Sequence, residues 1–319
     1  MLTFIVRYGY VPFMLLGING AAIALAASGA PKWSLVALIL FAVVCSFAAE
    51  RTLPYESSWN APGPDRFRDA VHAFVNESLI LVSVAVIPLM AAVIPFDGLW
   101  PIGLPFVVQV VFAVLVADFG ITVVHLISHK VGWLWRFHAV HHSLERFYGM
   151  NGLMKHPVHQ TFETAGGVLP LILLGMPVPV ASALAVCVAV QLLLQHSNAD
   201  YRIGPLRPIL ALNAGHRFHH LKWAGIGDVN FGLFTLIWDH LFRTYSFDPE
   251  KRFSSDDLGM AAKPDYPDDY LASWPNRSGD RTDGRSVEIQ PASTRRMTGL
   301  AANALANTNA IPTARVTPN

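Results

Sequence analysis

Long apolar runs separated by short polar segments fill the first two thirds of the chain. Four of these runs cover residues 11–30, 33–49, 78–95 and 104–126. Each is close to the ~20 residues that a helix needs to cross ~30 Å of hydrocarbon. The pattern therefore predicts four membrane-spanning helices.

A fifth apolar region, residues 166–195, is interrupted by the turn-forming stretch GMPVP at residues 175–179. The arm that precedes this stretch has only about ten residues, which is too short for a full span. We therefore expect a hairpin, re-entrant or fully spanning, that returns to the side of the membrane from which it started.

The composition agrees with a multi-spanning membrane protein. Hydrophobic residues make up 53% of the chain and charged residues 14%. The net charge is +1 and there is no dense Lys/Arg stripe, so nothing indicates nucleic-acid binding. Cys45 and Cys187 lie inside apolar runs and are interpreted as packing residues, not as a disulfide or metal pair. The first run is interpreted as an uncleaved helix because other spanning candidates follow it.

The loops between the apolar runs differ in their basic residues. Residues 50–76 and 129–165 carry several arginines and lysines, whereas residues 96–103 carry none. The positive-inside rule places both basic segments, and the chain from His196 onward, in the cytoplasm. Neither a haem-binding stretch nor an ER retrieval motif is recognisable in these residues, which slightly favours a bacterial protein. We therefore expect an integral protein of a bacterial inner membrane, with its histidine clusters at the cytoplasmic face.

We expect an all-α fold of polytopic membrane helices with a cytosolic, histidine-rich helical cap. Residues 1–49 are predicted to form an N-terminal transmembrane hairpin, residues 50–246 the histidine-rich domain, and residues 247–275 a C-terminal extension. Residues 276–319 contain few aromatic residues and show no periodicity, so they are predicted to be a disordered tail.

The thirteen histidines are the most informative residues of the sequence. The stretch HLISH places His125 and His129 one helical turn apart, on one face of a helix. The stretches HAVHH and HRFHH share a second spacing, i, i+3 and i+4, and His196 follows the last apolar run. The histidines expected at one membrane interface are His125, His129, His138, His141, His142, His196, His216, His219 and His220.

This concentration of imidazoles predicts a metal site. A single tetrahedral zinc takes four ligands and usually includes Cys or carboxylate, whereas nine imidazoles suffice for two ions with open coordination positions. Imidazole binds iron, copper, zinc or nickel, so the ligand set alone leaves the metal open. His156 is a candidate tenth ligand or a headgroup-level residue. His72, His159 and His240 are interpreted as ordinary packing or surface histidines.

Asp118 lies inside an apolar run, where an ionisable group is costly and suggests a function. It shares a helix face with His125 but lies about 10 Å from it along the axis. We expect Asp118 to orient a histidine or an amide of a neighbouring helix, or to bond a helix-packing donor. Asp239 is a candidate for similar support or for a helix cap.

The three histidine stretches resemble the histidine boxes of the fatty acid hydroxylase and sterol desaturase superfamily of membrane di-iron enzymes. The resemblance covers roughly residues 50–246. Relatives commonly have Arg where this chain has Leu126, and Glu where it has His159. The supporting matches are ERTLP at residues 50–54, Asp118, KHP at 155–157, QHSN at 195–198, NFG at 230–232 and WDHLFRTY at 238–245.

The resemblance implies two iron ions held by histidine, O₂ as co-substrate, and hydroxylation of a fatty-acyl or polar-lipid chain. A sterol-type desaturase or oxidase of the same superfamily is the alternative. The chain has no HPGG, GxGxxG or CxxC stretch, so a separate ferredoxin or cytochrome b5-like protein with its reductase is the expected electron donor.

Two other kinds of protein were weighed against an enzyme. A metal transporter needs ligands near the bilayer midplane, where only Asp118 is expected. A non-catalytic, metal-stabilised scaffold is the remaining alternative. Both are less well supported than an oxygen-dependent enzyme, because the histidines are predicted to cluster at one face.

Overall fold

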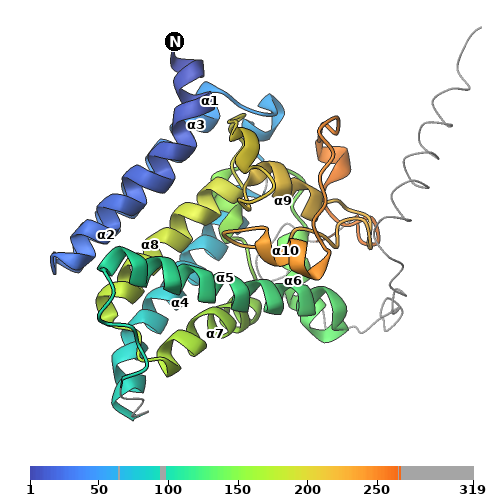
Figure 1. Cartoon of the computed structure of the whole chain (residues 1–319). Helices are drawn as coiled ribbons and strands as arrows, with labels where there is room; N and C mark the ends of the chain where they lie inside the picture. The colour runs from blue at the N-terminus through green and yellow to red at the C-terminus, as the bar shows by residue number, and fades with distance from the viewer. Residues whose placement is uncertain (64, 94–97, 265, 267–319) are drawn as a thin grey trace, which may run out of the picture. The chain divides into compact units, whose positions relative to one another are not determined.

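Helices make up nearly all the regular structure in the computed structural model, which describes residues 1–63, 65–93, 98–264 and 266 (Figure 1). Within these residues, β pairing is limited to isolated bridges between Pro54 and Ala199 and between Leu210 and Thr235. The long helices are α1 (Leu2–Pro12), α2 (Asn19–Ala27), α3 (Lys32–Thr52), α4 (Arg66–Val93), α5 (Phe106–Lys130), α7 (Pro157–Leu173) and α8 (Val178–Gln195). The shorter helical elements are η1 (Phe13–Ile18), η2 (Ser57–Asn60), α6 (Gly132–His142), η3 (Gly149–Leu153), η4 (Gly204–Leu206), α9 (Asn213–His219), α10 (Ile237–Phe242) and η5 (Ser255–Asp257). The predicted all-α fold is confirmed.

Four helices are long and apolar enough to cross a membrane, within the part of the chain that the structure describes. They are Leu2–Ala27, Lys32–Thr52, Phe106–Lys130 and Val178–Gln195. Three of them contain most of a predicted run, and the fourth is the second arm of the predicted hairpin. The run predicted at residues 78–95 falls in α4, and its last two residues lie outside the described residues. The chain is therefore a polytopic membrane protein.

The first span begins at Leu2, earlier than predicted. Arg7 does not interrupt it, because the guanidinium group pairs with Asp200 at 3.0 Å. Pro12 lies inside the helix and has no N–H to bond the preceding turn. The backbone accommodates this proline by continuing as the π-helical turn η1, so α1, η1 and α2 form one helix of 26 residues.

The interrupted region at residues 166–195 belongs to a helical hairpin, α7 and α8. Gly175 provides the positive φ of 83° that the turn between them requires. The first arm is longer than the predicted ten residues, because α7 begins at Pro157 and has 17 residues. The prediction was wrong here because it assigned the polar residues before Gly166 to a loop, whereas His159 and Glu163 are buried within the helix.

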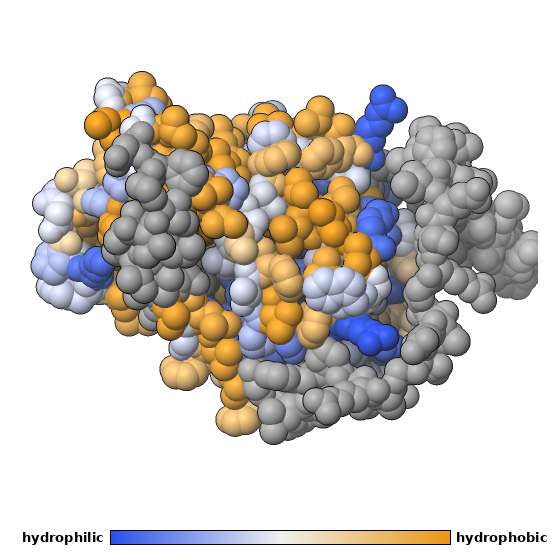
Figure 2. Space-filling view, turned by 90° about the horizontal axis from the view of Figure 1, so that it is seen from below, coloured by the Kyte–Doolittle hydropathy of each residue, from blue (hydrophilic) through white to orange (hydrophobic). Residues whose placement is uncertain are grey.

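The outer surfaces of the long helices are apolar. The side chains of Leu16, Leu40 and Val44 are 76%, 62% and 65% exposed. Figure 2 shows the molecule from below, and hydrophobic residues cover much of the visible face. Extended apolar surfaces of this kind mark contact with a membrane or a partner, and here they lie on helices long enough to span.

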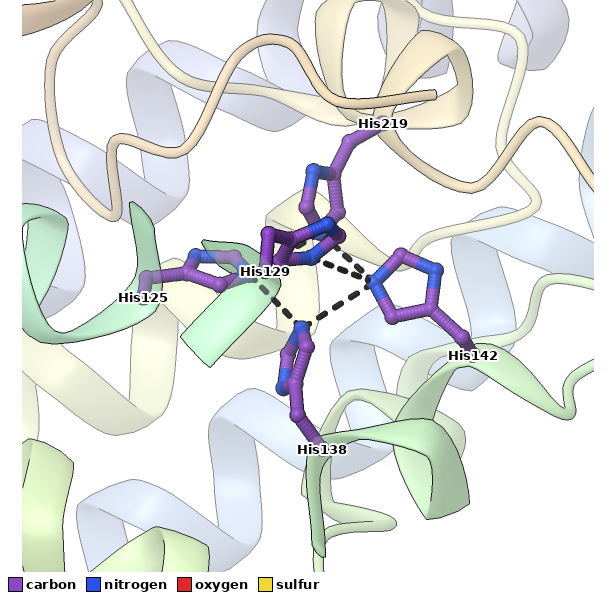
Figure 3. A group of neighbouring side chains, drawn as sticks. All are labelled: His125, His129, His138, His142 and His219. Atoms are coloured by element: carbon purple, nitrogen blue, oxygen red, sulfur yellow. Dashed lines mark hydrogen bonds between the residues drawn. The ribbon is translucent and has the colours of Figure 1, made fainter. Parts of the chain in front are cut away.

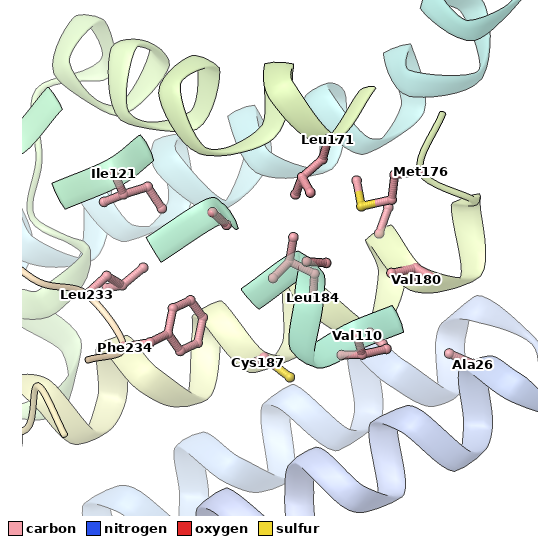
Figure 4. Close-up of a cluster of buried hydrophobic side chains, with 14 of the residues drawn as sticks. Ala26, Val110, Ile121, Leu171, Met176, Val180, Leu184, Cys187, Leu233 and Phe234 are labelled. Atoms are coloured by element: carbon pink, nitrogen blue, oxygen red, sulfur yellow. The ribbon is translucent and has the colours of Figure 1, made fainter. Parts of the chain in front are cut away.

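Helices α5, α7 and α8 pack around a shared apolar core (Figure 4). Its buried members include Ile121 from α5, Leu171 from α7 and Leu184 from α8. Helices α5 and α7 touch at Gly120 and Gly166, where a Cβ atom on Gly120 would overlap the carbonyl group of Gly166. Small residues permit such close backbone contact between membrane helices.

A second core joins the N-terminal spans to α8. Met14 and Ala42 are buried in the same cluster as Val190 and Leu194 of α8. Both cysteines are free, as predicted: Cys187 is buried in the core of α5, α7 and α8, and Cys45 packs against this second core. The predicted N-terminal hairpin thus packs onto the helix that precedes His196.

The short helices α6, α9 and α10 lie together near one end of α5 (Figure 1). The part of the predicted C-terminal extension that the structure describes packs on this histidine-rich region. The cluster that joins them consists of Trp59, Phe147, Phe218, Phe253 and Leu258. The tail predicted to be disordered, residues 276–319, lies outside the described residues.

Candidate metal centre

Four separate segments bring their histidines to one end of the long helices. Helix α5 carries His125 and His129 near its C-terminal end, and α6 carries the three histidines of HAVHH. His196 follows α8, and α9 with its C-cap residue carries the three histidines of HRFHH. Residues far apart in sequence meet there, since the Nε2 atoms of His125 and His219 lie 2.9 Å apart.

Five of these imidazoles form a first group, which we call group A (Figure 3). Its members are His125, His129, His138, His142 and His219, and one donor nitrogen from each lies within 4.8 Å of all the others. The Nε2 atom of His142 lies 3.1, 3.0 and 2.9 Å from the Nε2 atoms of His129, His138 and His219. The rings approach one point from several sides, as metal ligands do.

The other four imidazoles form group B. Its members are His141, His196, His216 and His220, again with donor nitrogens within 4.8 Å of one another. The Nε2 atom of His216 lies 3.1 Å from that of His196 and 3.1 Å from that of His220. The structure therefore divides the nine predicted histidines into two groups, each of which could hold a metal ion.

The two groups are neighbours because the HxxHH stretches contribute to both. In HAVHH, His141 belongs to group B and His142 to group A, and their ring centroids are 6.0 Å apart. In HRFHH, His219 belongs to group A and His220 to group B, 5.2 Å apart.

The tautomers of several imidazoles are fixed by their outer nitrogens. The Nδ1 atoms of His125 and His219 lie 2.9 Å from the carbonyl oxygens of Phe231 and Val229. A carbonyl oxygen only accepts, so Nδ1–H is the donor in each pair and Nε2 carries the lone pair. His141 is held in the same way by the carbonyl oxygen of Met154, at 3.0 Å. These nitrogens thus present lone pairs, not protons, to the centres of the groups.

Burial keeps the imidazoles neutral. Loss of water lowers the pKa of the box histidines outside the spanning helices well below the usual value of 6.5, and the neighbouring imidazoles add to this effect for each of them. These residues are His138, His141, His142, His216, His219 and His220. Burial also lowers the pKa of His196 to about 3. Neutral imidazole is the form that binds metal ions.

Asp118 supports the segment that holds His125 and His219. Its Oδ1 accepts hydrogen bonds from the backbone N–H groups of Leu233 (3.1 Å) and Phe234 (2.7 Å). Its Oδ2 accepts from the backbone N–H (3.1 Å) and the hydroxyl group (2.7 Å) of Thr235. Asp118 was expected to bond a histidine, an amide of a neighbouring helix or a helix-packing donor. Its partners are instead the backbone N–H groups and the threonine hydroxyl of a loop, just after the Phe231 carbonyl that fixes His125.

Asp239 supports the same segment at the preceding residues. Its Oδ1 accepts from the backbone N–H of Phe231 and its Oδ2 from that of Gly232, both at 2.8 Å. The hydroxyl group of Thr244 also donates to Asp239, at 2.6 Å. Two buried carboxylates therefore fix the loop whose carbonyl groups orient the rings of group A.

Asp228 is a residue that the sequence analysis missed. Its Oδ1 lies 2.9 Å from Nδ1 of His129, so His129 is held by a carboxylate where His125 is held by a carbonyl. The pairing with His129 and with Lys130 holds the pKa of Asp228 below its usual value, although burial opposes this shift. The only signal in the sequence is its position between HRFHH and NFG.

Two of the supporting motifs meet at Glu50. Its Oε1 accepts hydrogen bonds from the backbone N–H groups of Gly149 (2.7 Å) and Asn198 (3.2 Å). Glu50 thereby connects ERTLP at the end of α3 to QHSN around His196. Gly152 leaves room for that ring, because a Cβ atom there would lie 2.7 Å from Nδ1 of His196.

The remaining histidines lie outside both groups. His156 is the N-cap of α7 and accepts the backbone N–H of Val158 at Nδ1, 3.1 Å away, so the structure does not bring it in as a tenth ligand. His72 pairs with the carbonyl oxygen of Lys155, and the exposed His240 with that of Pro208. His159 is buried, with its ring centroid 4.3 Å from that of His138.

Comparison with known proteins identifies the family. The sequence model of the fatty acid hydroxylase family matches residues 110–244, which include every histidine of groups A and B. The same range contains Asp118, Asp228 and Asp239. No solved structure matches the chain significantly.

Two kinds of known protein are similar over longer stretches. The ornithine lipid hydroxylase OlsE of Rhizobium tropici is 34% identical over 257 residues, which cover 77% of this chain and 76% of the relative. The alkylglycerol monooxygenase of Danio rerio is 32% identical over 161 residues, 50% of this chain and 33% of the relative. The human alkylglycerol monooxygenase is 32% identical over 142 residues, 44% of this chain and 31% of the relative.

The chain belongs to the fatty acid hydroxylase family. It is a membrane-bound oxidoreductase, as predicted, with two histidine groups that could hold metal ions. The transporter and scaffold interpretations have no support from these relatives, which are named as a hydroxylase and monooxygenases.

Proposed function

We propose that the chain hydroxylates a membrane lipid with two iron ions held by groups A and B, O₂, and electrons from a separate protein. One observation carries the metal assignment. The Nε2 atoms of His125 and His219 lie 2.9 Å apart, and the bonds at Nδ1 leave both with lone pairs. Two nitrogen lone pairs at so short a distance repel each other unless one cation binds both nitrogens.

The number of nitrogens supports iron over a structural zinc. The closest Nε2 pairs in both groups are 2.9 to 3.1 Å apart, a spacing that suits two ligands of one metal ion. Five imidazoles in group A also exceed the four of a closed zinc site.

Bound iron would supply the redox chemistry that activates O₂ for attack on an unreactive C–H bond. One oxygen atom enters the lipid as a hydroxyl group, and the other leaves as water with two electrons and two protons from the donor. The chain holds the imidazoles neutral, fixes their tautomers through Phe231, Val229 and Asp228, and keeps bulk water from the buried groups.

A polar membrane lipid is the proposed substrate. The relative that matches over most of both chains is named for ornithine lipids, and the partial matches are named for alkylglycerols. The apolar core of α5, α7 and α8 ends next to His125 and His196, which suits a lipid chain that enters from the bilayer.

The reaction is proposed to take place at the cytoplasmic face of a bacterial inner membrane. The basic loops at residues 50–76 and 129–165 support this orientation by the positive-inside rule. A ferredoxin or a cytochrome b5-like protein with its reductase would then supply electrons from the cytoplasm.

Metal analysis and lipid mass spectrometry test the proposal together. We expect two iron ions per purified chain, and lipids that gain one oxygen atom in cells that express it. Iron content and lipid oxidation should fall together in His141→Ala. A loss of two hydrogens without oxygen gain would instead identify a desaturase, and metal uptake into vesicles without lipid oxidation would identify a transporter.

A further inference from the structure

A largely apolar cavity of about 80 Å³ lies between α5, α7 and α8. Its walls include Ile121 of α5, Leu192 of α8 and Leu233. Ile121 precedes His125 by one helical turn and Leu192 precedes His196 by one turn, so each of these lining residues lies about 6 Å along the helix from a member of one group. Such a volume holds several methylene-sized groups.

The cavity opens between α7 and α8. Thr164 and Val168 of α7, and Ala185 and Val188 of α8, line it and are only half-buried. Both helices belong to the hairpin, and α8 is one of the four candidate spans. A lipid chain can therefore enter from the apolar side of the molecule without crossing the polar cap.

One corner of this apolar cavity is charged. Lys155 and Glu163 both line it, and the Lys155 ammonium group pairs with Oε2 of Glu163. The two side chains are only 9% and 4% exposed. A buried ion pair in an otherwise apolar wall is costly unless its remaining hydrogen-bonding atoms are satisfied.

The second carboxylate oxygen of Glu163 is not satisfied. Its Oε1 is buried and has no hydrogen-bond partner among the described residues. The nearest ring nitrogen, Nδ1 of His159, lies 3.8 Å from the other oxygen, Oε2. The amide group of Gln160, which also lines the cavity, donates to Thr164 at 3.2 Å. A donor on a molecule that occupies the cavity would satisfy this oxygen.

The charged corner lies one side chain away from group A. The ring of His159 separates them, with its centroid 4.3 Å from that of His138 and its Nδ1 3.8 Å from Glu163. A lipid held at Glu163 would therefore have the neighbouring part of its carbon chain close to the metal-binding imidazoles.

We propose that Oε1 of Glu163 accepts a hydrogen bond from a neutral donor, an amide N–H or a hydroxyl group, on the lipid substrate. The inference rests on the proposed function and narrows its substrate to lipids with such a donor on the carbon chain. A cationic group is disfavoured there, because Lys155 already balances Glu163 and the neighbouring groups would hold cations.

The experiment compares lipid probes that differ only in the donor. N-methylhexadecanamide is compared with N,N-dimethylhexadecanamide, and hexadecanol with its methyl ether. Equilibrium binding is measured with the iron-loaded full chain in nanodiscs, without O₂ or reductant, and empty nanodiscs correct for partition into the bilayer. A hydrogen bond to a charged acceptor is expected to make at least one donor probe bind about tenfold tighter than its partner.

The double variant Lys155→Met/Glu163→Met removes the acceptor and keeps the side-chain volume. Apolar replacement of a whole buried ion pair is commonly neutral or stabilising, so this variant is expected to fold. Its preference for donor probes should fall below about twofold. The matched control, Lys251→Met/Asp257→Leu, removes an ion pair outside the cavity and should keep the wild-type preference. If the double variant does not fold, Glu163→Gln takes its place and should lower the preference at least threefold, because an amide oxygen is a weaker acceptor.

Absence of a preference in the wild type for either probe pair overturns the inference. A preference that persists unchanged in the double variant, or in Glu163→Gln, also overturns it. The result is independent of turnover. Selective binding of donor probes without any lipid oxidation would contradict the proposed function but not this inference. Lipid oxidation without selectivity for donor probes would contradict this inference but not the proposed function.

Discussion

The carboxylate of Asp118 accepts a 2.7 Å hydrogen bond from the backbone N–H of Phe234, 116 residues further along the chain. This bond, with those to Leu233 and Thr235, ties a spanning helix to the loop that orients the rings of His125 and His219. A residue that touches no imidazole thus helps to set the geometry of group A.

Replacement of Asp118 by Asn should therefore weaken metal binding. The new amide NH₂ would face the N–H and hydroxyl groups of Thr235, which already donate to the carboxylate. We expect metal affinity to fall about 10- to 100-fold, as for other residues that position ligands. Competition with a chelator measures the affinity. Thr235→Val, which removes one donor only, should cost much less, and equal affinities in Asp118→Asn and wild type would contradict the assignment.

Asp228 should matter because it orients His129. In Asp228→Ala the Nδ1–H of His129 loses its acceptor and the ring is free to rotate, so affinity at group A should again fall about 10- to 100-fold. Asp228→Asn keeps an acceptor oxygen and should retain most of the affinity. The control is Lys130→Gln, since the contact of Lys130 with Asp228 is 3.8 Å long and partly exposed. A loss in the control equal to that in Asp228→Ala would indicate a charge effect instead.

The unequal sizes of the groups predict unequal effects of losing one ligand. His141→Ala leaves three imidazoles in group B, whereas His142→Ala leaves four in group A. Both should abolish lipid hydroxylation, and His141→Ala should lose more iron when iron is limiting. Elemental analysis of the purified chains checks this order. His240→Ala is the matched control, because His240 is exposed, pairs with the carbonyl oxygen of Pro208 and belongs to neither group. An equal loss of metal in His240→Ala would contradict the assignment.

The metal-free chain should lose stability as the pH falls below about 6.5. Burial lowers the pKa of the box histidines outside the spanning helices, such as His138, His142 and His219, so the folded state takes up no proton where the unfolded state does. Each such histidine lowers the free energy of unfolding by up to about 1.4 kcal/mol per pH unit in that window. Denaturation midpoints of chelator-treated protein at about pH 7 and about pH 5.5 give the measurement. Identical midpoints would show that the rings are not buried as described.

The contact between α5 and α7 should not tolerate a larger residue. In Gly120→Ala the new methyl group would overlap the carbonyl group of Gly166, so the helices must separate, at a cost of about 1–3 kcal/mol. Gly20→Ala is the control, because a Cβ atom there meets nothing within 4 Å and alanine favours a helix. Thermal stability in detergent compares the two. Equal stability of both variants would mean that the helices do not touch at this point.

Much of the fold could be predicted from hydropathy, because spanning segments must be long and apolar whatever their neighbours are. The exception, the start of α7, depends on tertiary contacts. His159 and Glu163 have the polarity of a loop, and only their burial against Ser128 and Lys155 makes them part of a helix.

In the candidate site too, the features that depend on tertiary contacts could not be predicted from the sequence. The repeated spacing of HLISH, HAVHH and HRFHH identified all nine clustered histidines, but their division into five and four could not be predicted, because it depends on how α5, α6 and α9 cross. Asp228 was missed since an aspartate in a short loop is ordinary in sequence. Its pairing with His129 exists only in three dimensions.

The neighbouring histidines His141 and His142, like His219 and His220, serve different groups although one peptide unit joins them. In the proposed function each group holds one ion, and the peptide unit between neighbouring ligands then limits the distance between the two ions. An ion that binds in one group would order α6 and α9 and so align the ligands of the other group. Most of the entropic cost of ordering these helices would then be met when the first ion binds. When iron is added back to the metal-free protein, chains with only one bound ion should therefore be rare.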